Sequence, residues 1–132
     1  MGKKCIVSAV VMFVMAWGLS FFVHNILLGA DYSVTAGMRP PAETMKLIYF
    51  IILAHAIFGT AMAWVYVQGK EDKPWLMQGV RYGVAVACLT VIPMYLIYYV
   101  VTPIAFPVVI KQIAFDGIRI LLMGIVLAWI NR

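Results

Sequence analysis

Charged residues are scarce in this sequence, and their scarcity excludes an ordinary water-soluble domain. Only 11% of the 132 residues are Asp, Glu, Lys or Arg, against about 25% in a typical globular domain. Hydrophobic residues make up 65%, where about 45–50% is usual. A soluble fold of this length has too little interior to bury so much apolar side chain. Lipid is therefore the solvent that fits this composition, and the length allows one domain, residues 1–132.

Cysteines and catalytic motifs are also nearly absent. Cys5 and Cys88 have no CxxC spacing, and two cysteines are too few for a disulfide scaffold. The sequence contains no GxSxG, no HExxH and no glycine-rich phosphate loop, so an enzyme is the less favoured class. The net charge of +5 does not predict a nucleic-acid partner, because basic residues beside membrane spans are normal.

Four apolar runs are long enough to cross a bilayer as helices, at about 20 residues for a hydrocarbon core of about 30 Å. The first run follows Gly2-Lys3-Lys4. It is longer than the apolar region of a signal peptide, about 7–15 residues, so we expect it to be retained. The sequence therefore predicts an all-α, integral membrane four-helix transmembrane bundle. Its spans are about 5–30, 47–67, 75–101 and 108–130.

The connections predict how these spans follow one another. The polar stretch Asp31–Lys46 is expected to be a loop, with Pro41 opening the second span. The other two connections are short, so consecutive spans should be antiparallel neighbours. Six basic residues at one end of the bundle against three at the other predict that both termini are cytoplasmic. The six are Lys3, Lys4, Lys70, Lys73, Arg81 and Arg132, and the three are Arg39, Lys46 and Lys111.

Small residues at four-residue spacing predict the buried face of each span, since membrane helices associate through close backbone approach. These helix-packing candidates are Ala16, Ser20, Gly59, Ala63, Gly79, Gly83, Ala87 and Gly124. In the third span Pro93 precedes three tyrosines, Tyr95, Tyr98 and Tyr99. These are typical of a membrane interface, and a pocket shaped by the proline is the alternative.

Polar and ionisable residues lie in line with the small ones. His24, His55, Gln112 and Asp116 are therefore predicted to point into the bundle, and the three ionisable ones are predicted to lie in its outer half. Arg119 follows Asp116 by three residues, a spacing at which the two charges meet on one helix face. These five residues are the candidates for binding a ligand or a proton.

Several roles for these residues remain open. Asp116 and Arg119 are a mutually neutralised pair that fixes helix packing or contacts another subunit, or Asp116 takes up a proton or cation in a polar cavity. A further alternative is that His24 and His55 ligate a haem. The ligand types of His24, His55 and Asp116 also suit a metal, but the spacing does not require one and no metal is predicted.

The layout of the chain carries one resemblance. The first span ends in His24-Asn25-Ile26-Leu27-Leu28-Gly29, an outer turn runs from Thr102 to Pro107, and the last helix ends in Gly124-Ile125-Val126-Leu127-Ala128-Trp129. In this layout the chain resembles small four-span inner-membrane proteins of bacteria that are grouped as families of unknown function. The resemblance implies the fold and a bacterial inner membrane, and it implies no activity.

The sequence alone favours a non-enzymatic membrane component, either self-associating or an accessory subunit of a membrane complex. Its expected partners are the lipid bilayer and further copies or other membrane subunits, without nucleic acid. The first alternative is a small proton- or ion-coupled transporter that uses the Asp and His residues. The second is a haem-binding membrane protein.

Overall fold

The computed structural model describes residues 2–132, and no strand occurs among them. The first long helix consists of α1 (Lys3–Phe21) and a π-helical continuation, η1 (Phe22–Leu27). The others are α4 (Ile48–Gly69), α5 (Trp75–Val101) and α6 (Phe106–Ile130). All four are long and apolar enough to cross a membrane. The all-α prediction is confirmed, and the four long helices begin and end within a few residues of the predicted spans.

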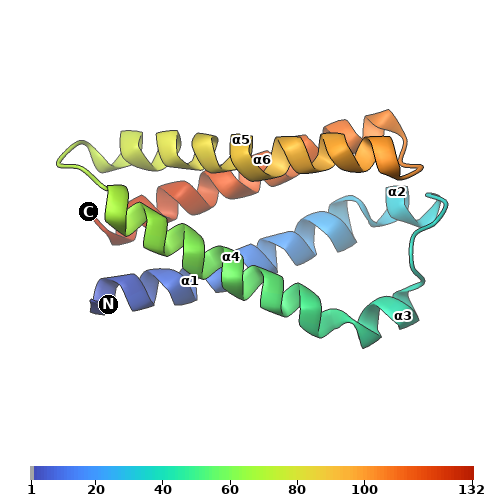
Figure 1. The fold of residues 1–132 in the computed structure, drawn as a ribbon, viewed down its shortest axis with the longest axis horizontal. Coiled ribbons are helices and arrows are strands. Elements are labelled where there is room, and N and C mark those ends of the chain that lie inside the picture. The colour runs from blue at the N-terminus through green and yellow to red at the C-terminus, as the bar shows by residue number, and fades with distance from the viewer. Residues whose placement is uncertain (1) are drawn as a thin grey trace.

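The long helices form two antiparallel hairpins (Figure 1). One hairpin pairs α1 with α4 and the other pairs α5 with α6, while contacts between α1 and α6 join them. The expectation that all consecutive spans are neighbours is wrong for α4 and α5, which make few contacts. Helices α4 and α5 lie close together at the loop that connects them and diverge towards the opposite end of the bundle, because α4 packs along α1 instead.

Glycines hold each hairpin together by close backbone approach. A Cβ atom on Gly59 of α4 would lie 2.6 Å from the backbone nitrogen of Phe13 in α1. A Cβ atom on Gly124 of α6 would lie 2.7 Å from the carbonyl oxygen of Gly79 in α5. These distances are too short for any residue but glycine. The structure buries all of the helix-packing candidates: Ala16, Ser20, Gly59, Ala63, Gly79, Gly83, Ala87 and Gly124.

The predicted loop between the first two spans is wrong in part, because it contains two short helices. These are α2 (Gly29–Ser33) and α3 (Pro41–Lys46). Pro41 does begin a helix, with Glu43 in its first turn. However, Leu47 departs from helical geometry (φ −107°, ψ 8°), so Pro41 opens α3 and not the second span itself.

Both chain ends lie at one end of the bundle, which we name the terminal end (Figure 1). Lys4 Nζ donates a hydrogen bond to the carbonyl oxygen of Arg132 there, at 3.3 Å. Asn131 Nδ2 donates to Ser8 Oγ at 2.8 Å and ties the end of α6 to α1. The opposite end, which we name the loop end, holds α2, α3 and the connection between α5 and α6.

Candidate functional site: a buried carboxylate beside a cavity

The centre of the candidate site is the carboxylate of Asp116 on α6, whose side chain is only 2% exposed. Arg119, one turn along the same helix, places Nε 2.9 Å from Oδ1. The other oxygen, Oδ2, accepts a hydrogen bond from the Tyr95 hydroxyl of α5 and lies 3.2 Å from His24 Nε2. Three side chains from three different helices therefore surround one buried carboxylate.

His24 belongs to the π-helical turn at the end of the first span. There the backbone N–H of Leu28 donates to the carbonyl oxygen of Val23, five residues earlier, at 2.9 Å. Such turns are rare and occur frequently at functional sites. Both imidazole nitrogens are engaged, because Nδ1 lies 2.8 Å from the Tyr32 hydroxyl while Nε2 faces Asp116.

Tyr32 extends this network towards the loop end. Gln112 Nε2 of α6 donates a hydrogen bond to the Tyr32 hydroxyl oxygen at 3.0 Å. Burial raises the pKa of Tyr32, and the nearby carboxylates of Asp116 and Asp31 raise it further. The Tyr32 hydroxyl therefore stays protonated at neutral pH. The contacts connect Gln112, Tyr32, His24 and Asp116 in series.

An ion pair at the loop end fixes the start of this chain of hydrogen bonds. Lys111 Nζ of α6 lies 3.0 Å from both carboxylate oxygens of Asp31 in α2. Asp31 directly precedes Tyr32, so this contact anchors α2 against α6 next to the tyrosine. The side chain of His24 is 27% exposed, so the network leads from an accessible imidazole to a shielded carboxylate.

A cavity of about 400 Å³ adjoins the carboxylate where α4 and α5 diverge. All four long helices contribute to it, so it exists only in the assembled bundle. Its wall combines a polar part with an apolar part. The polar part is Ser20, His24, His55, Thr90, Tyr95, Asp116 and Arg119, and the apolar part is Ala54, Phe58, Val91, Met94 and Ile120.

His55 lines this cavity but does not join the hydrogen-bonded network. Its Nδ1 lies 2.7 Å from the carbonyl oxygen of Ile51 in its own helix. A haem held between His24 and His55 would need a ligating nitrogen on each ring, and both nitrogens of His24 are engaged elsewhere. Within residues 2–132 no three His, Cys, Asp or Glu side chains are grouped to hold a metal ion.

The structure therefore brings together four of the five candidates, His24, Gln112, Asp116 and Arg119, and leaves His55 at the cavity wall. Sequence reasoning missed the roles of Tyr32 and Tyr95 as hydrogen-bond partners. Tyr95 continues the four-residue stripe of Gly79, Gly83 and Ala87, and that spacing was a usable signal. Tyr32 had no such signal, because the π-helical turn changes the register after His24.

Comparisons with known protein families, with curated proteins and with solved structures found no match for this chain.

Proposed function

We propose that this chain is a small proton-coupled membrane transporter that takes up a proton at the His24–Asp116 pair and holds a small organic anion in the adjacent cavity. The observation that carries the proposal is the position of His24, which bridges Tyr32 and the buried carboxylate of Asp116. Ionisable side chains within membrane spans are costly, about 2.5–3.5 kcal/mol each, and commonly mark proton or solute pathways.

The number of partners around Asp116 favours this function over a purely structural ion pair. Arg119 alone suffices to neutralise the carboxylate, yet an imidazole and a phenol also contact it. The cluster faces a cavity instead of close-packed side chains. The ionisable groups around His24 come from four elements: Tyr32 of α2, His55 of α4, Tyr95 of α5, and Asp116 and Arg119 of α6.

The charges of the cluster explain how a proton and an anion would be coupled. With His24 neutral, Asp116 and Arg119 cancel each other. A proton on His24 leaves two cations around one carboxylate, so the cavity wall gains a positive charge. That charge attracts an anion, and the apolar part of the wall suits an organic group attached to it.

Proton uptake by the purified protein in nanodiscs tests the proposal without a known substrate. Between about pH 8 and 5, the range in which histidines titrate, wild-type protein should take up about one proton more than the His24→Gln variant. Glu43→Gln, which removes an exposed carboxylate of α3 outside the cluster, is the control and should take up as many protons as wild type. Equal proton uptake by wild type and His24→Gln would contradict the proposal.

Transport is then measured in proteoliposomes with a panel of radiolabelled small carboxylates. An inward pH gradient should drive uptake of one of them by wild type and by Glu43→Gln, but not by His24→Gln. Proton uptake without solute uptake by any panel member would limit the assignment to proton binding and exclude this substrate class.

We also propose that both termini face the cytoplasm of a bacterial cell. The terminal end carries six basic residues against three at the loop end, and basic residues favour the cytoplasmic side. Labels placed at the two termini should react with membrane-impermeant reagents only from the cytoplasmic side.

A second candidate function, self-association, is favoured by the exposed side of α4. This helix has α1 as its main neighbour and carries a shallow groove between small residues. Small residues four apart, such as Ala56 and Thr60, allow a second helix to approach closely. We propose a second copy of this chain as the occupant. The groove is lined by Ala56, Ile57, Thr60, Ala61 and Trp64.

A further inference from the structure

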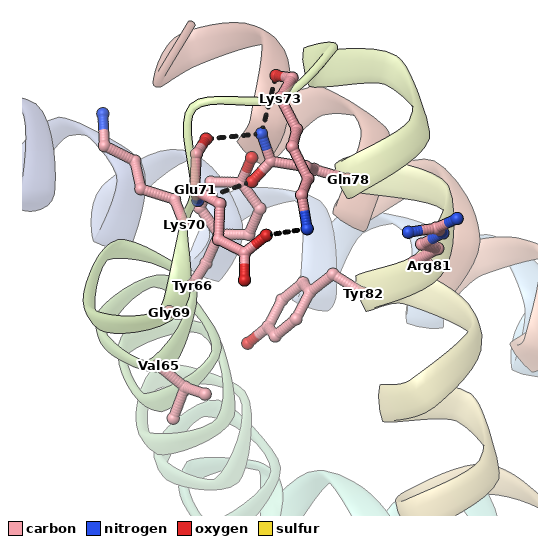
Figure 2. A pocket seen from close by; sticks show the side chains of 9 residues that line it. All are labelled: Val65, Tyr66, Gly69, Lys70, Glu71, Lys73, Gln78, Arg81 and Tyr82. Atoms are coloured by element: carbon pink, nitrogen blue, oxygen red, sulfur yellow. Dashed lines mark hydrogen bonds and ion pairs between the residues drawn. The ribbon is translucent and has the colours of Figure 1, made fainter.

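A second pocket, of about 340 Å³, lies at the terminal end, where the connection between α4 and α5 passes over the two helices (Figure 2). It is far along the bundle from Asp116 and independent of the function proposed above. The last turns of α4, the connecting loop and the first turns of α5 all contribute. The lining residues are Val65, Tyr66, Gly69, Lys70, Glu71, Lys73, Gln78, Arg81 and Tyr82.

One side chain, Gln78 of α5, makes three hydrogen bonds to the backbone of the loop over this pocket. Its Oε1 accepts a hydrogen bond from the backbone N–H of Glu71 at 2.8 Å. Its Nε2 donates to the carbonyl oxygens of Glu71 and Lys73, each at 2.8 Å (Figure 2). Such bonds fix the backbone of the loop before any ligand arrives, which reduces the entropy lost on binding.

The pocket is lined by three cations and one anion. Lys73 forms an ion pair with Glu71. Lys70 Nζ donates to the carbonyl oxygen of Asn131 at 3.1 Å, a neutral acceptor that leaves its charge in place. Arg81 makes no ion pair with any residue in the range 2–132. The lining therefore keeps a net positive charge and an available guanidinium, whose planar donors match phosphate oxygens.

The position of the pocket along the helices indicates which kind of phosphate compound it would bind. Arg81 lies six residues into α5, about 9 Å from its start, and therefore close to the boundary of the span. Val65, Tyr66 and Tyr82 form an apolar wall below the charges, and the Tyr82 hydroxyl donates to the carbonyl oxygen of Met62. A ligand with a charged headgroup and an apolar tail fits both the charged rim and the apolar wall of the pocket. Phospholipids have this chemistry, and their headgroups lie at the boundary of a membrane span.

We infer that this pocket binds the phosphate group of an anionic membrane phospholipid. Arg81 contacts the phosphate oxygens, Gln78 keeps the loop in position, and the first acyl carbons pack against the tyrosines. Lys70 adds positive charge nearby, but its ammonium points away from the pocket towards Asn131 (Figure 2). Glu71 opposes binding, because it neutralises Lys73 and repels the headgroup.

The test uses full-length protein in phosphatidylcholine nanodiscs that contain a small fraction of phosphatidylglycerol, with bound lipid measured by native mass spectrometry. Wild type should retain phosphatidylglycerol in preference to phosphatidylcholine. Arg81→Gln should weaken phosphatidylglycerol binding about fivefold, the effect of about one juxtamembrane cation. Glu71→Gln should strengthen phosphatidylglycerol binding several-fold, and a misfolded variant would not give such an increase.

The matched control is Arg39→Gln at the loop end, which makes the same chemical change outside the pocket and should leave lipid binding unchanged. An equal loss in Arg39→Gln and Arg81→Gln would overturn the inference, since it would indicate general attraction to charge. So would equal retention of the two lipids by wild type. Inorganic phosphate that binds in pure phosphatidylcholine nanodiscs, and displaces phosphatidylglycerol, would show that the pocket takes soluble phosphate instead.

Discussion

At the scale of single residues, the Asp116–Arg119 pair is expensive to bury, and its surroundings reduce that cost. The exposed fractions of the two side chains are 2% and 13%, so water contributes little to solvating either charge. Arg119 gains a second acceptor, since its Nη1 donates to the carbonyl oxygen of Ala16 in α1 at 3.2 Å. Asp116 gains two further partners, Tyr95 and His24. Removing one charge of such a pair costs more than removing both.

This cost predicts an asymmetry between single and double variants. Asp116→Asn should lower the free energy of unfolding by about 3–5 kcal/mol, because Arg119 is left as a buried charge without its carboxylate. The double variant with Arg119→Gln should recover most of that loss, since no charge remains unpaired. Unfolding in mixed detergent micelles measures both. A double variant as unstable as Asp116→Asn would show that the ion pair is not the source of the loss.

The same double variant separates stability from proton coupling. If the pair served packing alone, restoring stability would also restore the proton uptake of the cluster. We expect the double variant to take up fewer protons than wild type between about pH 8 and 5, because His24 no longer faces a carboxylate that favours its charged form.

At the scale of elements, the contact between α5 and α6 depends on glycines that face each other. A Cβ atom on Gly83 would lie 2.9 Å from the Cα atom of Leu121, and one on Gly124 would lie 2.8 Å from the Cα atom of Gly83. Both obstacles are backbone atoms, which cannot move aside without separating the helices. Without a hydrophobic driving force between helices in lipid, this van der Waals contact is a main source of their association.

Two glycines of α6 provide a matched comparison. Gly124→Ala should lower the free energy of unfolding by about 1–3 kcal/mol, as expected for overpacking at a close contact. Gly117→Ala, in the same helix, has no atom within 4 Å of the added Cβ. It should leave stability unchanged or raise it by up to about 1 kcal/mol, the difference in helix propensity. Equal effects of the two substitutions would contradict the role given to the glycine contact.

The π-helical turn of the first span is the element that assembles the candidate site. It ends at Leu27, and α2 then starts in a new direction that brings Tyr32 over the ring of His24. The two rings lie nearly parallel, with centroids 5.9 Å apart and an angle of 13° between their planes. An uninterrupted α-helix would place residues 24 and 32 about two turns apart on one face, too far for this contact.

At the scale of the whole molecule, the contact between α1 and α6 is the main interface between the two hairpins. α4 therefore lies at one side of the bundle, with its groove facing outward. This arrangement leaves room for the cavity beside Asp116 and also leaves a face on which a second copy would pack.

Self-association through that face predicts a concentration-dependent dimer. Wild type should migrate at twice the 14.7 kDa of the single chain in native electrophoresis after mild extraction. Ala61→Leu should weaken the dimer about tenfold by filling the groove, about 1.4 kcal/mol. Ala114→Leu, at an exposed alanine of α6, is the control and should leave it intact. Wild-type protein that stays a single chain at every concentration would exclude this second candidate.

The features of this protein that are local along the chain can be predicted from its sequence alone. Lipid requires each span to satisfy its own backbone hydrogen bonds, so four apolar runs of sufficient length predict four helices. Small residues such as Gly79 and Gly83 recur at helical spacing, which marks the packed face of α5. The pairing of Asp116 with Arg119 follows from their spacing of three residues.

Which helices meet could not be predicted from the sequence, because packing between spans depends on residues far apart along the chain. The divergence of α4 from α5 removed His55 from the network and opened the cavity. The π-helical turn brought Tyr32 to His24, and the α5–α6 contact brought Tyr95 to Asp116. Helical periodicity assigns a side chain to a face of its own helix, and the neighbour of that face is set by the packing of the whole bundle.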